Sequence, residues 1–114
     1  MDNCLFCKII KGEIPSAKVY EDDYVYAFKD IHPAAPVHVL VVPKVHIESL
    51  EGLNEENIQN IVPIHSGIKK VAQIMGINNT GYRVIVNCGE SAGQTVFHLH
   101  YHVLGGIRMG EKIL

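Results

Sequence analysis

The fold of this chain is decided by the stretch His98-Leu99-His100-Tyr101-His102-Val103-Leu104, which Gly105-Gly106 follows. The stretch alternates imidazoles with bulky apolar or aromatic side chains. Alternation with period two is typical of a half-buried strand, because successive side chains point to opposite faces. We predict a strand over residues 96–104 with the three histidines on one face. At about 3.3 Å per residue, neighbouring imidazoles are about 6.6 Å apart, a spacing that suits a polyanion.

A row of three imidazoles on one face is not explained by packing alone. A single histidine on a strand is typically a surface or core residue, but three titratable groups depress one another's proton affinity and gain little packing. Metal ligation is the alternative, because histidines two residues apart can chelate one zinc ion. We do not expect all three to reach one ion, since the outer two are about 13 Å apart.

Composition and length indicate one small domain over residues 1–114. The chain is 47% hydrophobic and 19% charged with a formal net charge of −2, which argues against disorder and against binding polymeric DNA or RNA. No apolar run approaches the roughly 20 residues of a membrane span, and Met1-Asp2-Asn3 leads into Cys4 without a signal-peptide core. We therefore expect a cytoplasmic protein with no membrane partner. Cys4 and Cys7 form a CxxC pair, which in a reducing compartment fits metal or redox chemistry.

The first half of the chain predicts one short helix and three strands. A helix over residues 5–11 ends at Gly12, and two strands over 17–21 and 24–29 form a hairpin around Asp22-Asp23. Residues 32–36 contain two prolines and predict a loop. A strand over 37–42 follows and ends at Pro43.

The second half predicts one long helix and two strands. The helix runs over residues 55–75, with Asn54 as N-cap, Gly76 as terminator and Pro63 as a kink or break. Its apolar stripe consists of Ile58, Ile61, Val62, Ile68, Val71, Ala72 and Met75. A strand over 82–87 precedes the histidine strand. The order predicts an α+β fold with an antiparallel sheet covered on one face.

The loop Gly89-Glu90-Ser91-Ala92-Gly93-Gln94-Thr95 precedes the histidine strand and can cradle a phosphate. Its glycines allow a close backbone approach, and it adds backbone amides, an amide side chain and a hydroxyl. A plain turn remains the alternative. If a phosphorus atom lies between the loop and the strand, His100 is the predicted nucleophile, because neutral imidazole attacks and is the main form at neutral pH. His98 would orient it, while His102, Thr95 and Asn87 would hold non-bridging oxygens.

The chain resembles the histidine triad nucleotide-binding proteins of the HIT family over nearly its whole length. The matching segments are Leu5-Phe6-Cys7-Lys8-Ile9-Ile10, Ile14-Pro15, Phe28-Lys29-Asp30-Ile31, His38, Pro43-Lys44-Val45-His46, Gly93-Gln94-Thr95 and His98 to His102. The resemblance implies a five-stranded antiparallel sheet with one long and one short helix, extended across a homodimer. It further implies hydrolysis or transfer at the α-phosphate of a purine nucleoside monophosphate derivative through a nucleotidyl-histidine intermediate.

The resemblance also implies roles for individual residues. His100 is similar to the nucleophile, and Asp30 resembles the carboxylate that accepts the ribose hydroxyls. Phosphate contacts fall on Asn87, Gly93, Thr95 and His102, with Gln94 in the same motif. Thr95 stands where many relatives have serine and keeps the hydroxyl. The base would lie between apolar walls formed by Leu5, Phe6, Ile9, Phe28 and Ile31, which are also ordinary core candidates.

Two implied roles compete for His46 and His98. His46 resembles a fourth histidine that assists protonation of the leaving group. The resemblance to some bacterial members of the family implies zinc binding through Cys4, Cys7, His46 and His98, which would form a closed structural site. The alternative is two free thiols. His32, His38 and His65 are assigned structural or solvent roles.

We therefore predict a phosphoramidate hydrolase of adenosine or guanosine 5′-monophosphate derivatives without an obligatory catalytic metal. One alternative enzyme activity is cleavage of dinucleoside polyphosphates, which uses the same α-phosphate chemistry. An alternative of another class is a nucleotide-binding or zinc-stabilised interaction module whose turnover is incidental. The sequence leaves open the preference between adenine and guanine and the amine that leaves.

Overall fold

The computed structural model describes residues 3–114. Met1 and Asp2, which belong to the predicted single domain, lie outside the described residues. The helices and strands are α1 (Leu5–Ile10), β1 (Lys18–Glu21), β2 (Val25–Lys29), β3 (Val37–Pro43), α2 (Ile61–Ile74), β4 (Arg83–Ile85) and β5 (Tyr101–Gly105). Three short 3-10 helices are η1 (Leu50–Gly52), η2 (Ile58–Asn60) and η3 (Glu90–Ala92).

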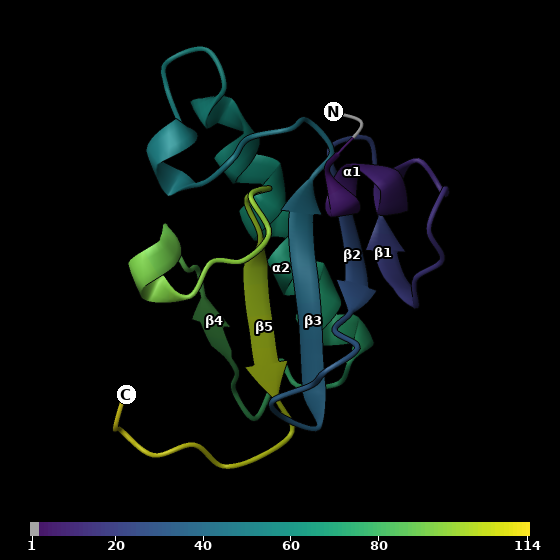
Figure 1. Ribbon diagram of the computed structural model, residues 1–114. Coiled ribbons are helices and arrows are strands. Elements are labelled where there is room, and N and C mark those ends of the chain that lie inside the picture. The colour runs from purple at the N-terminus through teal and green to yellow at the C-terminus, as the bar shows by residue number, and fades with distance from the viewer. Residues whose placement is uncertain (1–2) are drawn as a thin grey trace.

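The five strands form one sheet in the order β1-β2-β3-β5-β4, and every neighbouring pair is antiparallel. The sheet stands upright in Figure 1, with β3 and β5 at its centre. The register places His38 opposite Leu104 and Leu40 opposite His102. The predicted five-stranded antiparallel sheet with one long and one short helix is thereby confirmed.

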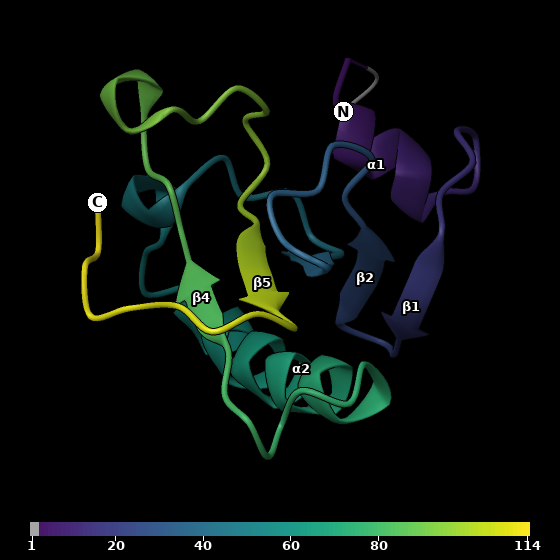
Figure 2. The same cartoon turned by 90° about the horizontal axis from the view of Figure 1, so that it is seen from below.

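The two helices lie on opposite faces of the sheet (Figure 2). The α2 face carries the larger core, which includes Val39, Val41, Leu99, Tyr101 and Val103. The α1 face carries a second core, formed by Phe6, Ile9, Tyr26, Phe28, Leu40 and Val42. The sequence predicts only one covered face. The second core exists because β2 and β3 are apolar on both sides, and the short helix uses that apolar surface.

Helix α2 starts six residues later than predicted. Asn54 does not cap it; its side chain accepts hydrogen bonds from the amides of Glu56 and Asn57 and caps a separate turn. Pro63 is the third residue of α2, where the backbone has no intrahelical acceptor for an N–H group, so the proline requires no kink.

The buried stripe of α2 consists of Ile64, Gly67, Ile68, Val71 and Ala72. Val62 and Ile58, which the sequence places on this stripe, are 74% and 49% exposed. A Cβ atom on Gly67 would lie 3.0 Å from Cγ2 of Val25. The glycine therefore allows the helix to approach β2 closely.

Strand β5 begins at Tyr101, five residues after the predicted start of the histidine strand. Continuing the β3–β5 register would place Leu99 opposite Pro43, which has no N–H group to donate to the ladder. The alternation nevertheless holds from residue 98 onward: Leu99, Tyr101 and Val103 enter the α2 core, and the histidines take the other face. The ring centroids of His100 and His102 lie 5.1 Å apart.

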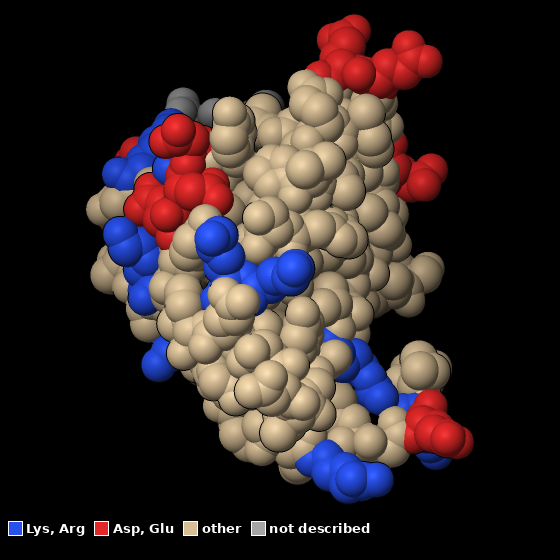
Figure 3. Space-filling model, turned by 180° about the vertical axis from the view of Figure 1, so that it is seen from behind, with Lys and Arg blue, Asp and Glu red and all other residues tan. Residues whose placement is uncertain are grey.

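Seen from behind, the molecule presents a largely uncharged surface with small separate groups of basic and acidic side chains (Figure 3). Neither α1 nor α2 has the length and apolar character needed to cross a membrane.

Candidate active site

A cavity of about 340 Å³ lies between α1, the end of β2 and the histidine segment. Apolar side chains form most of its surface: Leu5, Phe6, Ile9, Ile14, Phe28, Ile31, Leu40 and Val96. Its polar side chains include Asp30, Thr95, His100 and His102. All five residues predicted as base walls therefore line one cavity, together with the predicted nucleophile and one predicted phosphate contact from the preceding loop.

His100 lines this cavity and keeps one ring nitrogen free of hydrogen bonds within the described residues. Its Nδ1 donates a hydrogen bond to the carbonyl oxygen of His98 over 2.7 Å, which leaves Nε2 of the neutral ring with its lone pair. The ring of Phe6 packs edge-on against the imidazole with centroids 5.1 Å apart. Burial lowers the pKa of His100, so that the neutral, nucleophilic form dominates at neutral pH.

His102 is held in one tautomer by His38, a residue to which the sequence assigns no catalytic role. Nδ1 of His38 accepts a hydrogen bond from the amide of Ala34 over 3.0 Å, so that Nε2 of the neutral ring carries the proton. This Nε2 donates to Nδ1 of His102 over 2.9 Å. Nε2 of His102 then carries its own proton and can donate to a phosphate oxygen. Burial, together with His100 and His38, lowers the pKa of His102 to about 4.

Asp30 lies just past β2, as predicted, and lines the cavity. One of its carboxylate oxygens accepts a hydrogen bond from the amide of His32 over 2.8 Å. The other lies 3.4 Å from Nε2 of His38. Asp30 therefore sits at the boundary between the cavity and the His38–His102 pair, and its oxygens retain lone pairs for further donors.

The loop that precedes the histidine segment is fastened by Gln94, which is only 3% exposed. The Gln94 carboxamide accepts from the amide of Gly89 and donates to the carbonyl oxygens of Glu48 and Val96. Its side chain is thus occupied in holding the loop, and the adjacent Thr95 reaches the cavity. Gly93, with φ of +85°, adopts a left-handed conformation that favours glycine.

Asn87 and Gly93 are not among the residues that line the cavity. Asn87 follows β4 by two residues, and Ile85 at the end of β4 pairs with His102. Continuing the β4–β5 register by two residues would place Asn87 next to position 100, on the face that carries the histidines.

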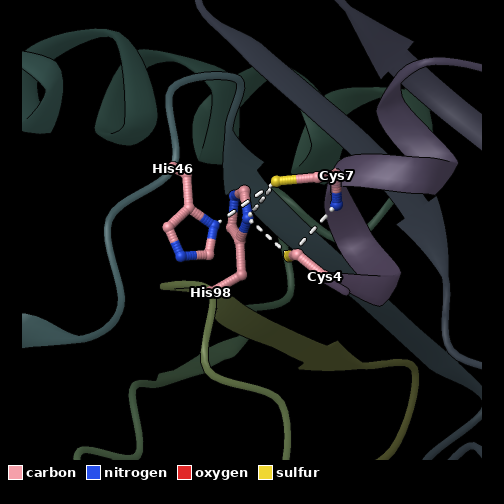
Figure 4. A group of neighbouring side chains, drawn as sticks. All are labelled: Cys4, Cys7, His46 and His98. Carbon is pink, nitrogen blue, oxygen red and sulfur yellow. Dashed lines mark hydrogen bonds between the residues drawn. The ribbon is translucent and has the colours of Figure 1, made fainter. Parts of the chain in front are cut away.

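Four further side chains converge beside the cavity: Cys4, Cys7, His46 and His98 (Figure 4). Sγ of Cys4 lies 3.4 Å from Nδ1 of His98, and Sγ of Cys7 lies 3.3 Å from Nδ1 of His46 and 3.5 Å from Nδ1 of His98. In a tetrahedral zinc site with usual bond lengths, sulfur and nitrogen ligands are about 3.6 Å apart. These three sulfur–nitrogen distances are close to that value, and all four ligand atoms lie within 4.8 Å of one another, which fits a tetrahedral metal site.

The hydrogen bonding of His98 also fits a metal. The ring is fully buried, and its Nε2 donates to the carbonyl oxygen of Pro43 over 2.8 Å, which leaves the Nδ1 lone pair directed at the two sulfur atoms. Metal-bound histidines commonly donate from their other nitrogen to a backbone carbonyl. Burial and the neighbouring Cys4 raise the pKa of Cys7 to about 11, so a thiolate here requires a compensating cation.

The side chains of His46 and His98 are therefore placed with the cysteines. Neither lines the cavity. The backbone carbonyl of His98 accepts the hydrogen bond that orients His100, the predicted nucleophile, whereas the imidazole of His98 lies with Cys4 and Cys7. His46 contacts the ring of His98, with centroids 5.0 Å apart.

Sequence reasoning missed His38, Leu40 and Val96 as parts of the site. His38 and Leu40 are two residues apart in β3, so the period of two would have placed them on the same face. Only the pairing of Leu40 with His102 reveals that this face is the histidine face. Val96 carries no sequence signal beyond its position beside Thr95.

Comparison with known proteins places this arrangement in a family. The model of the HIT domain matches residues 11–109. The chain is 41% identical over 112 residues to the purine nucleoside phosphoramidase of Escherichia coli, covering 98% of this chain and 94% of the relative. It is 44% identical over 105 residues to Protein HitA of Neisseria gonorrhoeae, covering 92% of this chain and 97% of that protein.

Comparison with solved structures leads to the same family. A HIT family hydrolase from Clostridium thermocellum superposes with a TM-score of 0.98 at 60% identity, covering 100% of this chain and 99% of the other. A histidine triad protein from Clostridium difficile gives a TM-score of 0.92 at 51% identity, covering 99% and 97%. The chain belongs to the HIT family, as the sequence predicts. One of these relatives is named a HIT family hydrolase, and another is named a purine nucleoside phosphoramidase.

Proposed function

We propose that this hydrolase of the HIT family cleaves purine nucleoside phosphoramidates at the α-phosphate. The observation that carries the proposal is that His100, whose Nε2 is free, lines a cavity with apolar walls suited to a base and with polar groups suited to a phosphate. The Escherichia coli relative with this activity in its name, 41% identical over almost the whole chain, supports the substrate class.

The proposed reaction has two displacements at phosphorus. In the first, Nε2 of His100 forms a bond to the α-phosphorus while the phosphorus–nitrogen bond to the amine breaks, and the amine leaves with a proton. The carbonyl oxygen of His98 holds the Nδ1 proton and stabilises the positive charge on the substituted ring. In the second, water attacks phosphorus, the Nε2–phosphorus bond breaks, and a nucleoside monophosphate is released.

The remaining residues bind and orient the substrate in this proposal. His102 donates from Nε2 to a non-bridging oxygen, and Thr95 and Asn87 hold the phosphate from the loop and from the segment that follows β4. Asp30 accepts the ribose hydroxyls at the mouth of the cavity. The base packs against Phe6 and the other apolar walls, which stabilises it by removing apolar surface from water.

The four-residue cluster of Cys4, Cys7, His46 and His98 fits zinc, and we include a structural zinc ion in the proposal. Two thiolates and two imidazoles fill a tetrahedral shell and leave no position for water, so the metal would have a structural role. His46 and His98 then act as ligands, and the leaving amine takes its proton from solvent water, to which the attacking water returns a proton in the second displacement.

We further propose that the protein is a single cytoplasmic domain over residues 1–114 that forms a homodimer through β4. This edge strand has only three residues, and Val84 on it and Ile107 beyond β5 are exposed apolar residues. Pairing of β4 with its copy would extend the sheet and cover them. Light scattering that gives the mass of one chain would overturn the dimer.

Steady-state kinetics with an AMP–amine conjugate and with diadenosine polyphosphates tests the activity. We expect kcat/KM for the phosphoramidate to exceed that for the polyphosphates, because the cavity of about 340 Å³ accommodates one nucleotide. A preference for the polyphosphates would overturn the proposed substrate class. Nucleotide binding without turnover of either would favour an interaction module.

A further inference from the structure

Helix α1 connects the four-residue cluster to the cavity. Cys4 is its N-cap and Cys7 lies in its first turn, while Leu5, Phe6 and Ile9 of the same helix form one wall of the cavity. Residues of the cluster and residues of the cavity wall are thus interleaved within residues 4–9. A shift of the N-terminal end of α1 would therefore move both the cluster residues and the cavity wall.

Phe6 is the side chain that contacts both sites directly. Its ring packs edge-on against His98 of the cluster, with centroids 6.1 Å apart, and against His100 of the active site, with centroids 5.1 Å apart. It is 5% exposed and also lines the cavity. The orientation of Phe6 therefore depends on the position of both histidines.

His98 provides a second connection through its backbone. Its imidazole offers Nδ1 to the cluster, and its carbonyl oxygen accepts the hydrogen bond that fixes the ring of His100. Any ligand that restrains His98 at the cluster therefore restrains the nucleophile as well.

Helix α1 has only six residues, too few to be stable by its own hydrogen bonds. At its N-terminus it is held by the contact from the amide of Cys7 to Sγ of Cys4 over 3.3 Å and by the packing of Phe6 and Ile9. Four metal–ligand bonds would fix residues 4 and 7 to the segments that carry His46 and His98. A wall that is already ordered binds a ligand at a lower entropic cost.

We propose that metal binding at the Cys4, Cys7, His46 and His98 cluster and nucleotide binding in the cavity are thermodynamically coupled through Phe6, so that each tightens the other. The inference rests on the proposed function, because it takes the cavity as the nucleotide site. Coupling is reciprocal: the factor by which the metal raises the affinity for AMP equals the factor by which AMP raises the affinity for the metal.

The first experiment starts from zinc-loaded protein. Equilibrium competition with a chromophoric chelator, with and without saturating AMP, measures the effect of AMP on zinc affinity, and a mixture without protein corrects for zinc bound by AMP itself. We expect AMP to raise zinc affinity about 5-fold or more. Equal zinc loss with and without AMP overturns the coupling. This readout needs neither turnover nor an isolated metal-free protein.

The second experiment measures AMP affinity by titration calorimetry on zinc-loaded and metal-free protein. We expect zinc to raise the affinity for AMP by the same factor by which AMP raises the affinity for zinc in the first experiment. Two unequal factors would contradict the reciprocal coupling. If zinc-loaded protein binds no AMP at all, the proposed function itself fails. If AMP binds with equal affinity to both forms, the function stands and the coupling fails.

Two variants separate the coupling from binding. Phe6→Leu keeps an apolar wall but removes the ring that contacts both histidines, and we expect the coupling factor to fall toward one while zinc still binds. Ile31→Ala is the matched control, because Ile31 lines the same cavity, is 85% exposed and lies outside α1. This variant is expected to weaken AMP binding equally with and without zinc. An unchanged coupling factor in Phe6→Leu would remove Phe6 as the connection.

Discussion

His38 and His102 form a hydrogen-bonded imidazole pair with 2.9 Å between Nε2 of the first and Nδ1 of the second. The amide of Ala34, which donates to Nδ1 of His38, sets the direction of this hydrogen bond. A backbone amide in the loop before β3 thereby determines which nitrogen of His102 presents a proton to the cavity.

Replacing His38 tests this relationship. We expect His38→Leu to lower kcat/KM by about 10-fold or more, because His102 loses the donor that fixes its tautomer. His38→Gln, which keeps a donor near the same place, is expected to recover part of the loss. Nitrogen-15 NMR of the His102 ring reports the tautomer directly. A tautomer unchanged in His38→Leu would contradict the positioning role.

Replacing His100 tests the nucleophile. We expect His100→Ala to reduce phosphoramidate hydrolysis by several orders of magnitude, as for other covalent nucleophiles. His65→Ala is the matched control, because His65 lies on α2 and packs against Tyr101 on the other face of the sheet. Mass spectrometry of quenched wild-type protein should detect a nucleotidyl adduct that His100→Ala lacks. Equal rates in the variant and the wild type would refute the mechanism.

The pH dependence follows from burial of the imidazoles. Burial lowers the pKa of His100, and the pKa of His102 is about 4, although the Asp30 carboxylate opposes both shifts. A lowered pKa keeps each ring neutral at a pH where free imidazole, with a pKa near 6.5, is already protonated. The acid limb of kcat/KM is therefore expected below pH 6.5. An acid limb centred above pH 6.5 would show that the rings are not buried as described.

The metal content of the purified protein tests the proposed zinc site. Protein purified without added metal should contain one zinc ion per chain, and Cys4→Ser should contain much less. Cys88→Ser is the matched control, because Cys88 is not part of the four-residue cluster. Addition of a chelator to the wild type should lower Tm, since a ligand that binds only the folded state stabilises it. Equal zinc content in both variants would remove Cys4 as a ligand.

Replacing Gln94 tests whether its side chain stabilises the loop over residues 89–95. We expect Gln94→Ala to lower the free energy of unfolding by about 1–3 kcal/mol, because the amide of Gly89 and the carbonyl oxygens of Glu48 and Val96 lose their buried partner. Gln59→Ala is the control, since the Gln59 side chain makes a single exposed hydrogen bond. Urea denaturation measures both variants, and equal effects would contradict the structural role of Gln94.

Much of the fold could be predicted from local patterns. The alternation around His100 identifies a strand and assigns each side chain to a face, and glycine or proline ends several elements close to the predicted positions. Errors arose where a local signal has two meanings. Pro63 breaks a helix interior but is tolerated in a first turn, and only the position where the chain turns onto the sheet decides which applies.

The sequence by itself determined the family, the five strands, and the set of residues that line the cavity from α1 and the histidine segment. The strands and their faces follow from periodicity and short motifs, which are properties of neighbouring residues, whereas the cavity residues of α1 follow from the resemblance to the HIT family. Only the tertiary structure decided between the two roles implied for His98, whose ring faces two cysteines and whose carbonyl oxygen faces His100, and only the structure paired His38 with His102. The physical reason is that strand register and the packing of α1 bring together residues far apart in the chain, and a hydrogen bond depends on the distance and angle between two groups in space, whatever their separation in sequence.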